Sequence, residues 1–440
     1  PSQPRDIVTE IYVNGDWVDI STDVRGDTDG ITLTHGRPNE ASDPQPSACS
    51  FVLNNPDGHY SPDWPEGDYY GTLDRNTPTR TTINIVKDTF TRTVLDGWGS
   101  SDTGHNYSLS GIGGTVAAGD MDVASGVGTL SIPVADATRY VQINTAGVND
   151  SYYDVDVAVT VSVPFTNVTG ATIAPLSIVV RDQGGSTSVW AQVLINTSEQ
   201  IFLRIWDGVA NAEIGAEVEL DALTHTSSQA LRCRFQAEGH AFRAKVWAVG
   251  SPEPYGWHVT AQSTLHPAAG LVTIFGWVLT GNTNTKPIVL SYDDLIVRSL
   301  VHAGEVSSWP ANWDTSGNDI TATVESFGIS RRLGQGSAPV QSTLYRGISA
   351  LDTLLAYWPG EGGEDSTVLS SAIGSFPMVV TGTTSFAAYS DINSTLPIPT
   401  FGADDVWTGG VPPHADPSEL QLRFLMHIPD GGLTPAFATG

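Results

Sequence analysis

Cysteines and known catalytic motifs are nearly absent from this chain. The 440 residues include only two cysteines, Cys49 and Cys233, which lie far apart and are expected in different domains. We interpret both as small buried apolar residues rather than as a disulfide. The sequence has no C-x-x-C or H-E-x-x-H motif, no G-x-S-x-G nucleophile elbow, no P-loop and no dinucleotide-binding glycine motif. These absences exclude the enzyme classes that depend on such motifs.

Basic side chains are also scarce. The chain has 20 Lys and Arg against 48 Asp and Glu, which gives a net charge of −28. A surface this acidic repels phosphate groups, so we expect no nucleic-acid partner. Its carboxylates could meet basic partners or divalent cations, but solvation of a large surface is the simpler interpretation.

Long apolar runs and helical periodicity are missing as well. No apolar run reaches the roughly 18 residues that a membrane-spanning helix needs, so the sequence predicts no membrane span. The first residues contain neither the basic nor the apolar segment of a signal peptide, which predicts synthesis in a cytoplasm. Residues 347–357 are the best helix candidate, with Ile348, Leu351, Leu354 and Leu355 at helical spacing.

Strand patterns occupy most of the remaining sequence. Apolar and polar residues alternate with period two in residues 155–161, 231–235, 241–247 and 321–327. Such alternation is typical of antiparallel strands with one solvent-facing side. The 45 Gly and 27 Pro residues fit many short strands joined by tight turns. We therefore predict an all-β protein, and its length is enough for two to four domains.

Two blocks of sequence carry a family resemblance. The first holds ITLTHGR, FVLNNPDGHYSP and YYGTL within residues 31–73, and the second spans residues 304–333. Their order resembles the tail-tip proteins, or minor tail proteins, of long-tailed phages of actinobacteria. The resemblance implies a β-domain that begins in residues 1–87 and is completed by residues 301–347.

The intervening sequence resembles a second family. It opens with DTFTR and GWG, continues with the alternating LRCRF, and closes with YDDLIV at residues 292–297. This pattern resembles concanavalin-like (laminin-G-like) jelly rolls, whose first and last strands lie side by side. A domain whose ends meet can be inserted into a host domain at little cost. We therefore predict that residues 88–300 form an inserted jelly roll; three domains in series is the alternative.

A further unit starts after the second block. Residues 348–440 resemble the opening of a second laminin-G-like sandwich and are too few to complete one. We therefore expect a longer natural chain.

The tail-tip resemblance implies a structural role in a virion, with assembly in the host cytoplasm, and no enzymatic activity. The partners it implies are further copies of the chain and other tail proteins (tube, tape measure, hub or fibre components). A trimer would indicate a baseplate hub, and a hexamer would indicate a distal tail ring. Two alternatives are a monomeric carbohydrate-binding attachment module and a glycoside hydrolase. Against the hydrolase, this sequence lacks the E-x-D-x-x-E strand that is typical of sandwich glucanases.

Candidate ligand sites fall in the predicted jelly roll. Exposed aromatic rings stack on sugars, so Trp206 and Asp207, at an expected turn, and Trp190 are the candidates for a host surface glycan. Asp88, Asp293 and Asp294 should converge where the first and last strands meet. Their carboxylates either fasten the strand ends by hydrogen bonds or bind calcium, the one open candidate for a cofactor.

Candidate interface residues fall in the split domain. Asn54–Asn55–Pro56–Asp57–Gly58 predicts a tight turn, followed by a loop rich in aromatic residues. The resemblance implies that such loops build contacts between subunits, which makes Tyr60, Tyr69 and Tyr70 candidates; packing on their own domain is the alternative. Arg331 and Arg332 form an adjacent basic pair that could bridge to acidic neighbours.

Overall fold

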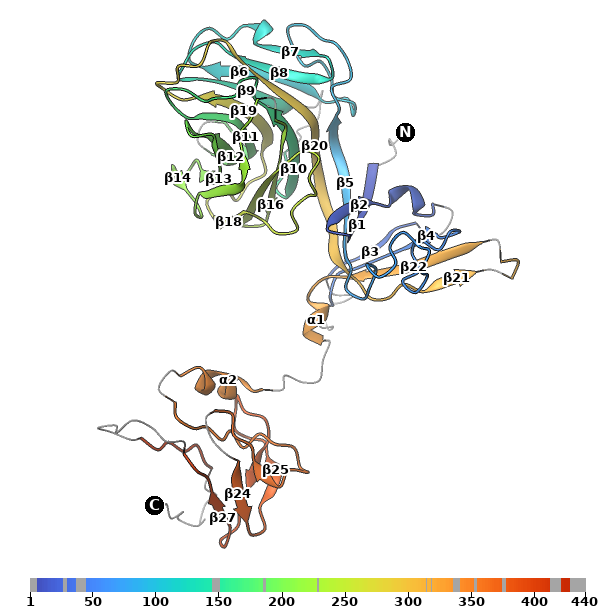
Figure 1. Cartoon of the computed structure of the whole chain (residues 1–440), viewed down its shortest axis with the longest axis vertical. Coiled ribbons are helices and arrows are strands. Elements are labelled where there is room, and N and C mark those ends of the chain that lie inside the picture. Colours follow the sequence, from blue (N-terminus) through green and yellow to red (C-terminus); the bar gives the residue numbers. More distant parts are fainter. Residues whose placement is uncertain are drawn as a thin grey trace. The chain divides into compact units, whose positions relative to one another are not determined.

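The structure is a computed structural model that describes residues 6–26, 30–36, 45–144, 151–184, 187–227, 229–313, 315–317, 319–334, 341–351, 354–373, 377–411 and 421–427. Within them the chain is almost entirely β-structure, as the sequence predicts (Figure 1). It forms two compact units, Pro1–Arg331 and Arg332–Gly440. None of the helices in the described residues is long and apolar enough to cross a membrane.

One part of the first unit is built from both ends of its sequence. Its strands are β1 (Asp6–Val13), β2 (Asp16–Asp19), β3 (Thr32–Thr34), β4 (Ala48–Asn54), β5 (Pro78–Asp88), β20 (Ile288–Val306), β21 (Ala311–Trp313) and β22 (Ile320–Phe327), with a 3-10 turn η1 (Ser21–Asp23). They pair in the order β2-β1-β5-β20-β22-β4-β3, and β21 also pairs with β22. Their inward side chains form a core of their own around Ile11, Phe51 and Val324. We call this part the split domain.

The described residues between β5 and β20 form, together with part of β20, a two-sheet sandwich, the jelly roll. One sheet continues from β20 through β10 (Val155–Ser162), β16 (Leu231–Glu238), β17 (Ala241–Ala248) and β18 (Val259–Gln262), and includes β7 (Met121–Ala124) and β8 (Val127–Ile132). The other contains β6 (Asn106–Ile112), β9 (Ala137–Asn144), β11 (Ile173–Asp182), β12 (Val189–Ile195), β13 (Gln200–Asp207), β14 (Ala212–Glu213), β15 (Val218–Thr224) and β19 (Leu271–Val278). A 3-10 turn, η2 (Ala118–Asp120), precedes β7. Val, Ile and Leu from both sheets fill the core.

Two long strands connect the split domain and the jelly roll. β5 and β20 pair antiparallel from Pro78↔Glu305 to Asp88↔Leu295 (Figure 1). The predicted boundary between residues 300 and 301 therefore lies inside a 19-residue strand and not in a loop. Because the chain leaves along β5 and returns along β20, the jelly roll occupies the connection between two neighbouring strands.

Both cysteines are buried and free, as predicted, and they lie in different cores. The interpretation of residues 155–161 was wrong, however, because β10 is buried on both faces. Its outer face carries Asp156, which Arg234 and Arg298 cover with ion pairs. A polar residue in an alternating strand therefore marks a buried charge here, and not a solvent-facing side.

The second unit contains short elements. α1 (Arg331–Gly334) begins at the last residue of the first unit and is followed by α2 (Thr343–Ser349). The strands of the second unit are β23 (Val368–Leu369), β24 (Met378–Thr381), β25 (Ser385–Tyr389), β26 (Ile398–Thr400) and β27 (Val406–Thr408). They pair as β23-β24-β27 and β25-β26. The helix expected at residues 347–357 instead lies earlier, because the Ser342 side chain caps it by accepting a hydrogen bond from the Tyr345 N–H. The last residues of the sequence, 428–440, lie outside the described residues.

Candidate functional site

Two tryptophans lie together on the outer face of the eight-stranded sheet. Successive side chains of β12 and β13 point to opposite faces of the sheet. Val189, Ala191 and Ile205 point into the core, whereas Trp190 and Trp206 point outward. The strand register places Trp190 opposite Trp206, and their rings stack with centroids 6.2 Å apart and an interplanar angle of 24°. Both side chains are half-buried. The structure thus brings two of the three predicted glycan residues together.

Further aromatic rings continue this face. Phe275 of β19 lies edge-on to Trp190 at 6.2 Å, and Tyr140 of β9 lies 5.1 Å from Phe275. β11 runs between β12 and β19 and places only Ser177 opposite Phe275, so the larger rings can meet across it. Burial raises the pKa of Tyr140, which keeps its hydroxyl protonated. We call Tyr140, Phe275, Trp190 and Trp206 the aromatic row.

Polar groups are fixed beside the aromatic row. Arg204 donates from Nε and Nη2 to Gln192 Oε1 at 3.0 and 2.6 Å, and Gln192 Nε2 donates to Ser177 Oγ at 3.0 Å. The Arg204 guanidinium lies 5.2 Å from the centroid of the Trp206 ring. Aromatic surface flanked by rigid hydrogen-bonding groups is the arrangement that a sugar ring needs. The sequence did not indicate Tyr140 or Phe275, and only the strand register could have identified them.

Asp207 does not belong to this face. Trp206 and Asp207 are the last two residues of β13, directly before the predicted turn, which begins at Gly208, but Asp207 is 0% exposed. Its carboxylate accepts hydrogen bonds from the N–H groups of Val209 and Ala210, at 2.9 and 3.0 Å. It also accepts from Ser263 Oγ at 2.6 Å and contacts His266 Nε2 at 2.8 Å. The expectation that Asp207 contacts a glycan was therefore wrong, because buried groups already occupy its oxygens.

Asp88 is likewise occupied. It is 0% exposed, and Arg92 donates to both of its oxygens, at 2.7 and 2.8 Å. Tyr107 Oη donates to Oδ2 at 2.6 Å, and the Phe90 N–H donates to Oδ1 at 2.9 Å. These contacts match the alternative in which the carboxylate fastens the ends of the jelly roll, and they leave it no free oxygen for calcium.

The other two predicted calcium ligands lie close by on β20. Asp294 is exposed and has a φ of 48°, at an irregularity in the pairing of β20 with β10. Burial raises the pKa of Asp293. Among the described residues, no group of three or more His, Cys, Asp or Glu side chains is arranged to hold a metal ion.

The predicted interface tyrosines differ in exposure. Tyr60 is 2% exposed, stacks on Trp309 at 6.3 Å, and donates its hydroxyl to Asp23 Oδ2 at 2.5 Å. Tyr69 is half-buried beside it, whereas Tyr70 is 53% exposed. Tyr60 therefore belongs to the core of the split domain, as the packing alternative holds, and Tyr70 is the ring open to a partner.

The adjacent arginines also differ. Arg331 is half-buried, donates from Nη2 to Asn76 Oδ1 at 2.7 Å and lies 5.6 Å from the Phe327 ring. It ties the end of β22 to the segment before β5. Arg332 is exposed.

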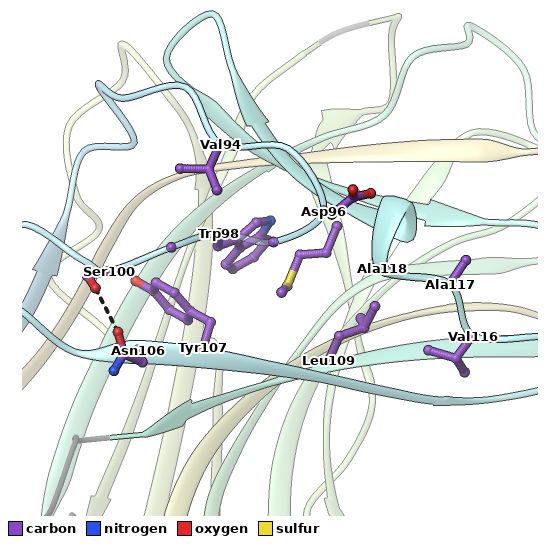
Figure 2. Close-up of a pocket in the computed structure, with 13 residues that line it drawn as sticks. Val94, Asp96, Trp98, Ser100, Asn106, Tyr107, Leu109, Val116, Ala117 and Ala118 are labelled. Atoms are coloured by element: carbon purple, nitrogen blue, oxygen red, sulfur yellow. Dashed lines mark hydrogen bonds between the residues drawn. The ribbon is translucent and has the colours of Figure 1, made fainter.

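A separate cleft of about 630 Å³ opens at the edge of the jelly roll (Figure 2). It lies between edge strand β6 and the segment 94–100, and Trp98, Tyr107 and Leu109 form its apolar part. Ser100 Oγ donates to Asn106 Oδ1 at 2.7 Å at one side of the opening. Among the described residues that line the cleft, Asp96 is the one carboxylate, so they include no facing acid pair of the kind that glycoside hydrolysis uses.

Comparison with known proteins gives likeness in fold only. No protein-family model matches the chain, and no curated protein matches its sequence. The CBM2 module of the evolved Dit of Lactobacillus casei BL23 phage J-1 is 11% identical with a TM-score of 0.33, over 52% of this chain and 99% of that one. A β-1,3-glucanase from Mycobacterium marinum is 10% identical with a TM-score of 0.33, over 49% of this chain and 98% of that one. The β-glucanase of Bacillus licheniformis is 15% identical with a TM-score of 0.33, over 48% of this chain and 96% of that one. Likeness at this level carries no argument about what the chain does.

Proposed function

We propose that this protein is a structural component of a phage tail tip, in which the split domain assembles with further copies and with other tail proteins while the jelly roll faces the host. The sequence resemblance in residues 31–73 and 304–333 supports the proposal. The observation that carries it is the pairing of β5 with β20, which extends from Pro78 to Asp88 with two register shifts, because an assembling domain can carry a large insertion there and keep its own sheet paired.

Two strands of the split domain offer edges for assembly. β3 and β21 are exposed at every residue, and each pairs with one neighbour only among the described strands. Trp313 of β21 is 71% exposed. Unpaired edges of this kind readily add a strand from another chain, and a closed ring of subunits removes them.

The purified chain is expected to form a discrete assembly of three or six copies, and Trp313→Lys is expected to shift it to the monomer, since a lysine on an edge strand opposes strand addition. Light scattering gives the mass. Leu95→Lys is the matched control, because Leu95 is 76% exposed in the jelly roll and should leave the assembly intact. A wild-type monomer at all concentrations would count against self-assembly, and three or six copies would distinguish a hub from a distal ring.

The aromatic row favours a second function for the jelly roll, contact with a host surface glycan. Trp206→Ala is expected to weaken binding to cell-wall polysaccharide by about tenfold or more, since losing one aromatic anchor costs about 2 kcal/mol. Titration of purified polysaccharide measures it. Trp64→Ala is the control, because Trp64 is 48% exposed in the split domain. Equal affinity of both variants would contradict a role for the aromatic row.

A further inference from the structure

Charged side chains are buried where the jelly roll meets the split domain. They extend from β1 and β5 across β20, β10, β16 and β17 to the loop that follows β17. None of these side chains is more than 12% exposed. We call them the junction network, which consists of Glu10, Arg80, Asp156, Arg234, Lys245, Glu253 and Arg298.

Glu253 is the centre of the network. It lies in residues 249–258, the loop between β17 and β18 of the jelly roll, which we call the clasp loop. Arg80 of the split domain donates to both of its oxygens at 2.9 Å. Arg234 Nη1 donates to Oε1, and Lys245 Nζ lies 2.7 Å from the same oxygen. One carboxylate therefore joins a cation of the split domain to two cations of the jelly roll.

The clasp loop also contacts the β1–β2 hairpin. Tyr255 lies 4.9 Å from the Tyr12 ring and stacks on Trp17 at 6.4 Å. The Glu253 N–H donates to Asp16 Oδ1 at 3.2 Å, and the Arg80 guanidinium lies 4.2 Å from the centroid of Trp17. The loop is thus a second connection between the two parts, independent of the β5–β20 pairing.

The charges of the junction network do not balance. Three carboxylates face four cations, so the network holds one cation in excess. Burial lowers the pKa of Lys245 to about 8 although Glu253 lies 2.7 Å away, which agrees with an excess of cations in the network. Burial opposes ionisation of Glu253 too, but hydrogen bonds from Arg80 and the charge of Arg234 outweigh it and hold its pKa far below the usual range.

We propose that the junction network fixes the direction in which the jelly roll leaves the split domain, and that Glu253 is the residue on which this orientation depends. Among the described strands, only β5 and β20 run through both parts, and the twist between paired strands varies widely. Buried ion pairs contribute little net stability, but their geometry is directional and can select one arrangement among several. Removing Glu253 leaves four cations against two carboxylates, whereas removing Lys245 leaves three against three.

Spin labels test this in the full chain. Glu66→Cys in the split domain and Glu213→Cys in the jelly roll place labels at two exposed positions, while both native cysteines are buried and stay unlabelled. When all other residues are native, the two spin labels should give a single narrow distance distribution. Glu253→Gln is expected to lose that single distance and give a broad distribution. Lys245→Met is expected to keep it, since the change removes the excess cation and conserves volume.

Two outcomes would overturn the proposal. The first is a distance as narrow in Glu253→Gln as in the native protein. The second is an equally broad distribution in Lys245→Met, which would mean that packing, and not charge, sets the orientation. If Glu253→Gln does not fold, the double variant Glu253→Gln/Lys245→Met replaces it, because it leaves three cations against two carboxylates and so keeps the native excess of one cation. A broader distribution in the double variant then supports the role of Glu253, and an unchanged one refutes it.

Discussion

Asp207→Ala is expected to lower the free energy of unfolding of the jelly roll by about 3–5 kcal/mol, since each buried group left unsatisfied costs about 1–3 kcal/mol. The change removes the acceptor for two backbone N–H groups and for the Ser263 hydroxyl, and it removes the partner of His266. Urea denaturation measures the loss. Asp221→Ala is the matched control, because Asp221 is an exposed carboxylate on β15 and should change stability by no more than about 0.5 kcal/mol.

The loss of stability in Asp207→Ala is expected to depend on pH. Burial opposes ionisation of Asp207, but the hydrogen bond from Ser263 and its other partners outweigh burial and lower its pKa. A carboxyl group with a lowered pKa in the folded state stabilises the protein fully above its ordinary pKa of about 3.9, and loses that contribution as the pH falls further. The difference in stability between the native chain and Asp207→Ala should therefore shrink below about pH 4. A difference that grows on acidification would contradict this assignment, and so would a loss at neutral pH below about 1 kcal/mol.

Asp88→Ala is expected to lower the free energy of unfolding by about 3 kcal/mol, because breaking a buried ion pair from one side costs about 3–5 kcal/mol and Arg92, at 23% exposed, recovers part of this through solvation. The variant also leaves the Tyr107 hydroxyl and the Phe90 N–H without their acceptor. Thermal and urea denaturation measure the effect, with and without a calcium chelator.

The control distinguishes fastening from calcium binding. Asp294→Asn changes another predicted calcium ligand to a residue that tolerates a φ of 48°, so it should leave the melting temperature unchanged. The chelator should also have no effect on the native chain. A chelator-dependent fall in melting temperature that Asp294→Asn abolishes would restore the calcium interpretation.

The sequence predicted the all-β class and the burial of both cysteines, because alternation and residue type act locally. It also selected Trp190 and Trp206, which the strand register places face to face. It could not show that Phe275 and Tyr140 share their face, since alternation identifies residues on the same side of a strand but does not say which side points inward.

Long-range contacts explain what the sequence-based interpretation missed or assigned wrongly. A Trp-Asp-Gly sequence is typical of an exposed turn, but Ser263 and His266 come from more than 50 residues away to cover Asp207. Glu253 and Arg80 are 173 residues apart, so no local pattern indicates that they meet. Asp156 resembles a solvated residue of an alternating strand, and only the fold places two arginines over it.

The pairing of Asp88 with Leu295 has a consequence for how such chains diversify. Neighbouring strands lie about 5 Å apart. One recombination event that replaces residues 89–294 would therefore exchange the jelly roll and leave β5 and β20 of the split domain paired. Glu10, Arg80 and Arg298 all lie outside residues 89–294, so the retained split domain would present one carboxylate against two arginines, and an incoming domain would have to supply a second carboxylate. Such an exchange would change the surface of the jelly roll and conserve the surface of the split domain.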